Sequence, residues 1–173
     1  MHRHAIPLIA LAAGAACIVA ISTQALGATD PGPQGFLAGL YAHYPVAGKA
    51  HPFDPVGPRA SQVFDAPLVA LIRRDQRSAK DEVGALDGDP LCDCQDDGGM
   101  TWKIAKLAPQ GPDKAVAQVR LTFPETPRPR IDDLTVALVK TPAGWRIHDI
   151  SSRDTPSLRG LFLPADRRAP GRK

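Results

Sequence analysis

The sequence predicts an α+β domain in which N-terminal helices pack on an antiparallel sheet. Two observations lead to this fold class. Apolar residues before residue 87 recur at the spacing of a helix face, whereas those after residue 100 alternate with polar ones, as in half-buried strands. The strand-like segments also follow one another across short turns rich in proline and glycine, which favours an antiparallel meander.

Export is predicted from the first 27 of the 173 residues, which are typical of a secretory signal peptide. A short basic start precedes an apolar run from Ile6 to Ile21, and small residues precede Ala28. A retained membrane anchor is a weaker alternative, because the run is shorter than the roughly 20 residues of a spanning helix. A lipoprotein that uses Cys17 is weaker still. The expected divisions are a signal peptide at 1–27, a lead-in at 28–35, a single α+β domain at 36–163 and a disordered basic tail at 164–173.

The first helix is predicted around residues 36–44, where apolar and aromatic side chains share one face. Pro45 should stop this helix, because its ring cannot continue the backbone hydrogen-bond ladder. Residues 46–59 are rich in proline and glycine and should form an ordered surface loop. The predicted helix face consists of Phe36, Leu37, Leu40, Tyr41 and Tyr44.

A second helix is predicted to start near Asp65, whose carboxylate can cap it, with Pro67 in the first turn. Asp75 falls on the apolar face of this helix. Either the helix is rotated enough to bring Asp75 to solvent, or the carboxylate faces a cavity; the first is preferred because an unpaired buried charge is costly. The apolar face consists of Leu68, Leu71, Ile72, Ala79 and Val83.

Four strands are predicted after residue 100, and a short helix from Pro156 to Phe162 should close the domain. In the last strand Trp145 and Ile147 should face the core, so alternation sends Asp149 inward and His148 to solvent. If the sheet curves, a helix across its mouth would enclose a cone-shaped cavity, either open to a ligand or filled with side chains. The strands are expected at Thr101–Leu107, Ala115–Phe123, 134–139 and Trp145–Ile150.

The segment Asp87–Asp97 joins the two halves of the chain and holds five of its eighteen acidic residues. Cys92 and Cys94 flank a single residue within it. In an oxidising compartment the two thiols should pair in a local disulfide that pins the loop; unpaired core cysteines and a redox or metal role are alternatives. Acidic neighbours disfavour a reactive thiolate, and two cysteines make only half of a structural zinc site.

The carboxylates of this segment do not fit a helix–loop–helix calcium site, which needs glycine at the sixth position and glutamate at the twelfth. Cys92 and Gly98 occupy those positions counted from Asp87. We instead expect Asp89 and Asp96 to accept hydrogen bonds from backbone N–H groups. No metal and no cofactor are predicted. The predicted binding residues are Tyr41, Asp75, Asp89, Gln95 and Asp96.

Catalysis and nucleic-acid binding receive little support from the sequence. An enzyme could use Asp75 or Asp149 as a base, but His148 should be poorly placed to assist, and no nucleophile or phosphate-binding motif is present. Basic residues outnumber acidic ones by ten to five over 128–173, and acidic residues outnumber basic ones by nine to four over 65–97. Because the basic residues are scattered and lack interleaved aromatics, we interpret this asymmetry as two differently charged faces.

Three segments, in this order, resemble a bacterial family, the domain-of-unknown-function family numbered 3828, which is similar to the nuclear-transport-factor-2-like superfamily. They are Phe36–Tyr44, Asp87–Asp96 and Gly144–Ile150, and the resemblance covers about Phe36–Leu163. It implies a curved-sheet α+β fold, cone-shaped and cystatin-like, and an exported bacterial protein. It implies no established activity, since that superfamily contains enzymes, binding modules and scaffolds alike.

The predicted function is that of a periplasmic or secreted, non-catalytic binding or interaction module. Its partner would be an envelope protein or a small molecule and not a nucleic acid, and it would meet the membrane only transiently, through the signal peptide. The contact surface would be the cavity of the sheet or the segment Asp87–Asp97. The alternatives are a small-molecule enzyme with a carboxylate base in the cavity, and a thiol-redox protein that uses Cys92 and Cys94.

Overall fold

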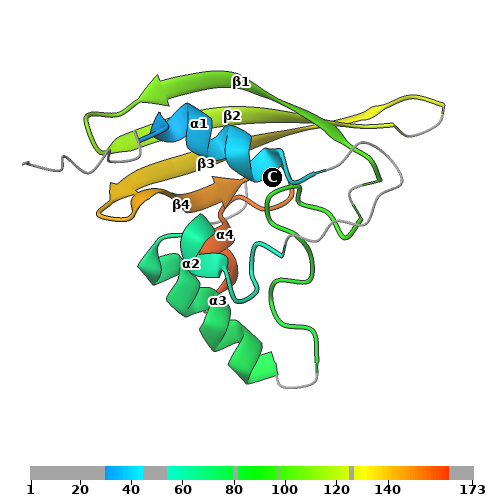
Figure 1. The fold of residues 1–173 in the computed structure, drawn as a ribbon. Coiled ribbons are helices and arrows are strands. Elements are labelled where there is room, and N and C mark those ends of the chain that lie inside the picture. The colour runs from blue at the N-terminus through cyan, green and yellow to red at the C-terminus, as the bar shows by residue number, and fades with distance from the viewer. Residues whose placement is uncertain (1–29, 45–53, 80–81, 97, 125–126, 164–173) are drawn as a thin grey trace, which may run out of the picture.

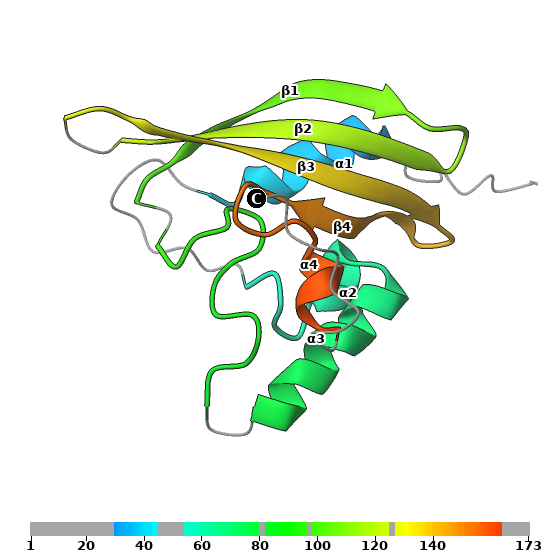
Figure 2. The same ribbon diagram turned by 180° about the vertical axis from the view of Figure 1, so that it is seen from behind.

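The computed structural model describes residues 30–44, 54–79, 82–96, 98–124 and 127–163, and it has the predicted α+β fold. A four-stranded antiparallel sheet in the order β1-β2-β3-β4 curves over α1, while α2, α3 and α4 gather beside β4 (Figure 1). Figure 2 shows the sheet from its other side, and none of the described helices lies across that face. The elements are α1 Gly32–Tyr41, α2 Ala60–Val63, α3 Ala66–Ala79, β1 Thr101–Pro109, β2 Lys114–Phe123, β3 Arg130–Thr141, β4 Gly144–Ser151 and α4 Leu158–Leu161.

Several of the sequence predictions fall outside the described residues. These are the signal peptide, the helix stop at Pro45, most of the loop 46–59 and the basic tail 164–173. The part of that loop which the structure describes, residues 54–59, consists of turns.

Strand alternation follows the predicted pattern and builds the core. On β2 and β3, every second side chain from Ala115 to Phe123 and from Leu134 to Leu138 is buried. Burying an apolar side chain of this kind contributes about 1.5–3 kcal/mol to folding. Side chains fill the space between α1 and the sheet, so the cavity expected under a curved sheet is a packed core at this place. Leu37, Tyr41, Val119 and Leu121 are all 0 % exposed there.

A β-bulge changes the facing of side chains along β4. The pairing of β3 with β4 shifts so that Ile147 and Asp149 take successive partners on β3, and His148 is the extra residue between them. Ile150 therefore points into the core and is 4 % exposed, while Asp149 is directed to the other side. The prediction that Asp149 faces inward is wrong, because strict alternation does not continue across a bulge.

The first helix begins earlier than the sequence predicts. α1 starts at Gly32, inside the expected lead-in, with Pro33 in its first turn, and the Asp30 carboxylate accepts a hydrogen bond from Gly32 N at 3.0 Å. Proline suits this position, since the first N–H groups of a helix have no intrahelical partner. The predicted apolar face is confirmed on the helix, where Leu37, Leu40 and Tyr41 are each at most 9 % exposed and Phe36 is partly buried. The helix ends at Tyr41 and not at residue 44, so Tyr44, which is 6 % exposed, is buried from the turn that follows.

The long helix α3 lies where the sequence predicts it, and Asp65 caps it by accepting a hydrogen bond from Leu68 N at 2.9 Å. The helix ends at Ala79, so Val83 lies beyond it and is 75 % exposed; its predicted place on the apolar face is wrong. The sequence does not predict α2, because four residues are too few to show a helical period.

Candidate functional site

The segment between α3 and β1, residues 82–96, is called the Cys loop below, and the carboxylate of Asp75 holds its beginning. This carboxylate accepts hydrogen bonds from Ala85 N at 2.9 Å and from Leu86 N at 3.5 Å. A Cβ at Gly84 would collide with the same carboxylate, so glycine lets the chain pass close to α3. Asp75 is half-buried and borders the wider hollow described below, and its carboxylate is bonded to backbone N–H groups, so it is neither turned fully to solvent nor left as an unpaired charge.

Two further carboxylates hold the rest of the Cys loop. Asp89 accepts a hydrogen bond from Leu91 N at 2.8 Å, and the Tyr44 hydroxyl donates to its other oxygen. Asp96 accepts a hydrogen bond from Gly98 N at 2.9 Å. The predicted bonding of Asp89 and Asp96 to backbone N–H groups is confirmed. These acidic residues therefore act first as part of the loop's scaffold.

Cys92 and Cys94 form a close pair, with sulfur atoms at bonding distance and Cα atoms 5.1 Å apart. Asp93 between them has φ +50°, in the left-handed region that few residues other than glycine adopt. Asp89 N donates to Cys94 O at 2.8 Å, which closes the loop on itself. A Cβ at Gly88 would lie 2.7 Å from Cys94 O, so this close approach requires glycine. The geometry agrees with the predicted local pairing of the two thiols.

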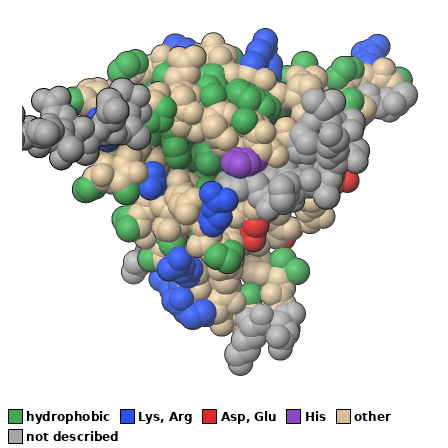
Figure 3. Space-filling model, in the orientation of Figure 1, with side chains coloured by type: hydrophobic (Ala, Val, Ile, Leu, Met, Phe, Trp, Pro, Cys, Tyr) green, Lys and Arg blue, Asp and Glu red, His purple; other side chains and the backbone are tan. Residues whose placement is uncertain are grey.

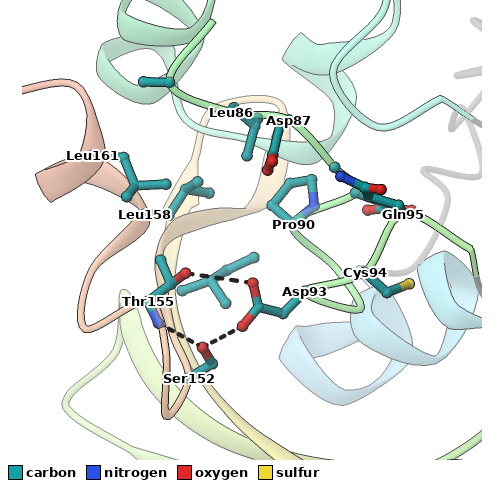
Figure 4. Close-up of a pocket in the computed structure, with 14 residues that line it drawn as sticks. Leu86, Asp87, Pro90, Asp93, Cys94, Gln95, Ser152, Thr155, Leu158 and Leu161 are labelled. Carbon is teal, nitrogen blue, oxygen red and sulfur yellow. Dashed lines mark hydrogen bonds between the residues drawn. The ribbon is translucent and has the colours of Figure 1, made fainter. Parts of the chain in front are cut away.

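Asp93 joins the Cys loop to the turn that follows β4. Its carboxylate accepts hydrogen bonds from the Ser152 hydroxyl and from the Thr155 hydroxyl, the latter at 3.4 Å (Figure 4). Ser152 Oγ also accepts a hydrogen bond from Thr155 N at 2.9 Å, which fixes the turn itself. The left-handed backbone at Asp93 thus directs a carboxylate onto residues about 60 positions later in the chain.

A cavity of about 270 Å³ lies between the Cys loop and the segment that runs from the end of β4 into α4. Figure 4 shows Leu86, Pro90 and Leu158 around it, with the Asp87 carboxylate directed inward from the rim and Asp93 at the opposite side. We call this space the loop cavity. It is lined by Ala85, Leu86, Asp87, Gly88, Asp89, Pro90, Asp93, Cys94, Gln95, Ile150, Ser152, Thr155, Leu158 and Leu161.

A second, wider hollow of about 570 Å³ lies on the other side of residues 86–89, against the C-terminal half of α3. It shares Asp87 and Asp89 with the loop cavity and adds Asp54, Asp75 and Glu82. No Lys, Arg or His side chain is among the described residues that line either space. Both hollows are therefore strongly acidic.

The predicted binding residues are not all brought together. Asp89 and Gln95 line the loop cavity, Asp75 borders only the wider hollow, and Asp96 borders neither. Tyr41 is fully buried and its hydroxyl donates to Leu91 O at 2.8 Å, so it holds the Cys loop in place from within the core. Burial, together with the negative charge of nearby Asp89, raises the pKa of Tyr41 far above its usual range, which keeps the hydroxyl a donor.

Sequence reasoning missed the half of the loop cavity contributed by residues after β4. Ser152, Thr155 and Leu158 line it, yet they lie far from the Cys loop in the chain. Only the apolar pattern of the predicted closing helix, with Leu158 and Leu161, indicated that this segment packs against something. Asp87 lies in the segment that the sequence singled out, but nothing in the sequence distinguishes it from its acidic neighbours.

A separate polar cluster lies where α3, β4 and α4 meet. Asp65 is 6 % exposed, and its carboxylate lies 2.6 Å from His148 Nδ1 and 3.3 Å from Arg159 Nη1. The sequence predicts Asp65 as a cap and His148 as a surface residue; the side chain of His148 is indeed 50 % exposed, but its contact with Asp65 was not expected. Asp65 lies far from His148 and Arg159 in the sequence, and their contacts join α3, β4 and α4.

The Asp149 carboxylate caps α4 rather than facing a cavity. It accepts hydrogen bonds from Arg159 N at 3.0 Å, from the Ser157 hydroxyl at 2.7 Å and from Ile150 N at 2.9 Å. Asp75 is likewise occupied by backbone N–H groups. Both carboxylates considered as possible bases are therefore engaged in holding the fold.

Charge divides between two regions, but not along the two segments that the sequence analysis contrasts, because Arg73 and Arg77 belong to residues 65–97, where acidic residues outnumber basic ones. Lys and Arg side chains gather over α2 and α3 (Figure 3), where Arg73 and Arg77 border a shallow hollow on the outer side of α3. The two acidic hollows lie on the side of the Cys loop. Within the described ranges, no group of three or more His, Cys, Asp or Glu side chains is arranged to hold a metal ion. None of the described helices combines the length and apolar character that crossing a bilayer requires.

A scan of the chain against protein-family models finds no match, and searches of curated proteins and of solved structures find none either. The resemblance to the family numbered 3828 therefore stays a prediction that these comparisons do not test.

Proposed function

We propose that this protein is an exported, non-catalytic binding module that holds a small ligand group in the loop cavity. The observation that supports the proposal is how the cavity is built: two segments distant in sequence meet around it, and Asp93 bonds one to the other. Its volume of about 270 Å³ lies just below the roughly 300–1,000 Å³ of pockets for drug-sized molecules. The space therefore suits a small molecule or a single side chain of a partner protein.

The cavity walls are held in place before any ligand binds. The Cys92–Cys94 pair, the hydrogen bonds to Asp89 and the contact of Asp93 with Ser152 each restrict the Cys loop. A binding site that is already ordered loses less conformational entropy when a ligand enters. This favours recognition as the role of the loop over a purely connecting role.

The enzyme and redox alternatives have weaker support. The two carboxylates considered as bases, Asp75 and Asp149, accept hydrogen bonds from backbone groups, which leaves them less available for proton transfer. Cys92 is 1 % exposed and surrounded by acidic residues, conditions that disfavour a reactive thiolate. The signal-like N-terminus and a cysteine pair in one loop both fit an oxidising compartment, periplasmic or extracellular.

The experiment that tests this proposal blocks the cavity at its rim. In Ala85→Trp, an indole on an exposed lining residue would occupy the space, whereas Ala143→Trp places the same ring in the exposed β3–β4 turn as a control. We expect compounds from a small polar fragment library to shift the NMR resonances of Gln95, Thr155 and Leu161 in the wild type and the control, but not in Ala85→Trp. Failure of every fragment to shift these resonances, or equal binding to Ala85→Trp, would count against the proposal.

A further inference from the structure

The charged side chains that line the loop cavity are all of one sign. Asp87, Asp89 and Asp93 line it, and none of the described residues that line it is Lys, Arg or His. The wider hollow behind residues 86–89 adds three more carboxylates, and no cation is among its lining residues in the part of the chain that the structure describes. A concave surface with one sign of charge focuses its field and attracts ligands of the opposite sign. An anionic ligand would be repelled from this site.

The three carboxylates differ in whether the fold already uses them. Asp89 accepts hydrogen bonds from Leu91 N and the Tyr44 hydroxyl, and Asp93 accepts those of Ser152 and Thr155. Asp87 has no hydrogen-bond or ion-pair partner among the described residues, and its carboxylate is directed into the cavity (Figure 4). The structure thus leaves one carboxylate at the rim for a ligand.

The remainder of the wall combines apolar side chains with the polar side chains of Gln95, Ser152 and Thr155. Its apolar part includes Pro90, Ile150 and Leu158, which are buried, and Leu86 and Leu161 also line the space. A charged head beside Asp87 would therefore continue into a short aliphatic chain that lies against these side chains. A volume of about 270 Å³ suits a ligand of this small size.

We propose that the group bound in the loop cavity is a primary alkylammonium ion, whose charge is paired with Asp87 and whose methylene chain contacts Leu86, Leu158 and Leu161. This inference rests on the proposed function and specifies its ligand chemistry. An ammonium is a compact charge with three donors, so it can bond to Asp87 and still keep water or a second acceptor at the open rim. The same group occurs in free aliphatic amines and at the end of a lysine side chain.

The test compares three compounds of equal chain length, pentylamine, 1-pentanol and pentanoate, by NMR titration of the wild-type protein. We expect the amine to bind best and the carboxylate to bind worst. In Asp87→Asn the affinity for the amine should fall roughly fivefold, to about that of the alcohol, while the affinity for the alcohol stays unchanged. Asp113→Asn, in the exposed β1–β2 turn, removes the same charge elsewhere and should leave all three affinities unchanged.

The two sources of the ammonium group are separated by a further comparison. A short peptide with one lysine, and the same peptide with that lysine acetylated, are titrated beside pentylamine. Tighter binding of the unmodified peptide than of the amine indicates a protein partner, and the reverse order indicates a free amine; loss of binding on acetylation supports the proposal in either case. The affinity for the amine should also fall as salt is raised, because the Asp87 pair is open to solvent.

The outcomes distinguish this inference from the proposed function. If amine and alcohol bind equally, or if Asp87→Asn leaves the affinity for the amine unchanged, the ammonium assignment is wrong while the cavity remains a binding site. If none of the three compounds binds the wild type while other fragments of the library do, the ammonium assignment alone is wrong. If no fragment binds either, or if Ala85→Trp binds these compounds as well as the wild type does, both proposals fail.

Discussion

The sheet and residues 54–96, called the acidic half below for the carboxylates that hold its backbone, satisfy their backbone groups in opposite ways. In the sheet, N–H and C=O groups pair with each other across β1 to β4, so side chains decide only which face is buried. In the acidic half, carboxylates accept the backbone N–H groups that have no strand or helix partner. Asp54, Asp65, Asp75, Asp89 and Asp96 all have this role.

The contrast distinguishes acidic residues whose carboxylates hold the backbone from Asp87, whose carboxylate is left for a ligand. An acidic residue bonded to backbone N–H groups has most of its acceptor capacity taken, and its removal leaves buried donors without a partner. Asp87 has no such role among the described residues, so its removal should affect binding and leave the fold intact. A cluster of acids therefore need not be a metal or catalytic centre, because most of its members can serve the chain itself.

The largest expected effect on stability comes from a substitution in the apolar core of the sheet. Leu121 on β2 is 0 % exposed, and Leu121→Ala should lower the free energy of unfolding by about 4 kcal/mol, because it removes buried surface and leaves a cavity. Ile131→Ala on β3, at a side chain that is 52 % exposed, should change it by no more than about 0.5 kcal/mol. Urea denaturation followed by circular dichroism measures both. Similar losses in the two variants would mean that alternation does not locate the core.

A smaller loss of stability is expected where a carboxylate, and not apolar packing, holds the fold. Asp65→Ala removes the cap of α3 together with the contacts to His148 and Arg159, and should lower the free energy of unfolding by about 2 kcal/mol. Asp65→Asn keeps an oxygen for Leu68 N and should lose less.

A double-mutant cycle with His148→Ala separates the cap from the contact between Asp65 and His148. Coupling between the two substitutions is expected, because the two side chains are 2.6 Å apart. Additive losses would show that the Asp65–His148 contact contributes nothing beyond the cap.

The same contrast explains what sequence reasoning could and could not predict. Strand faces and the cap at Asp65 follow from local rules, since alternation and capping involve residues close in the chain. The exceptions are bulges and long-range side-chain bonds. The extra residue His148 reversed the facing of Asp149, and no local pattern marks it. The meeting of Asp93 with Ser152 depends on how the acidic half docks on the end of β4.

The candidate site was predicted in part for the same reason. The unusual composition of Asp87–Asp97 located the Cys loop, and Asp89 and Gln95 do line the cavity. The opposite wall, with Thr155 and Leu158, belongs to a segment whose sequence indicates only a short helix. Sequence periodicity can find each wall of a cavity, but not that the two walls face each other.

The smallest effect is expected from a carboxylate on the open face of the sheet. Arg120 donates to Asp133 at 2.7 and 2.9 Å across β2 and β3, and this hydrogen bond, more than the charge of Arg120, lowers the pKa of Asp133 from its ordinary value of 3.8. Because the folded-state pKa is the lower one, the pair stabilises the fold above pH 3.8, and the contribution is lost as the pH falls further through the folded-state pKa. With side chains 42 % and 57 % exposed, solvent and salt screen the pair, so the effect should be small.

Asp133→Asn should therefore shift the urea midpoint slightly at neutral pH, less in high salt, and not at all at a pH well below 3.8. The measurement is a series of urea titrations of wild type and variant across this range. A loss of stability at neutral pH as large as that of Asp65→Ala would contradict the comparison. It would mean that the sheet depends on carboxylates for its stability as much as the acidic half does. A loss that persists at low pH would instead indicate that the asparagine disturbs the strand pairing, because a protonated Asp133 no longer carries the charge that the substitution removes.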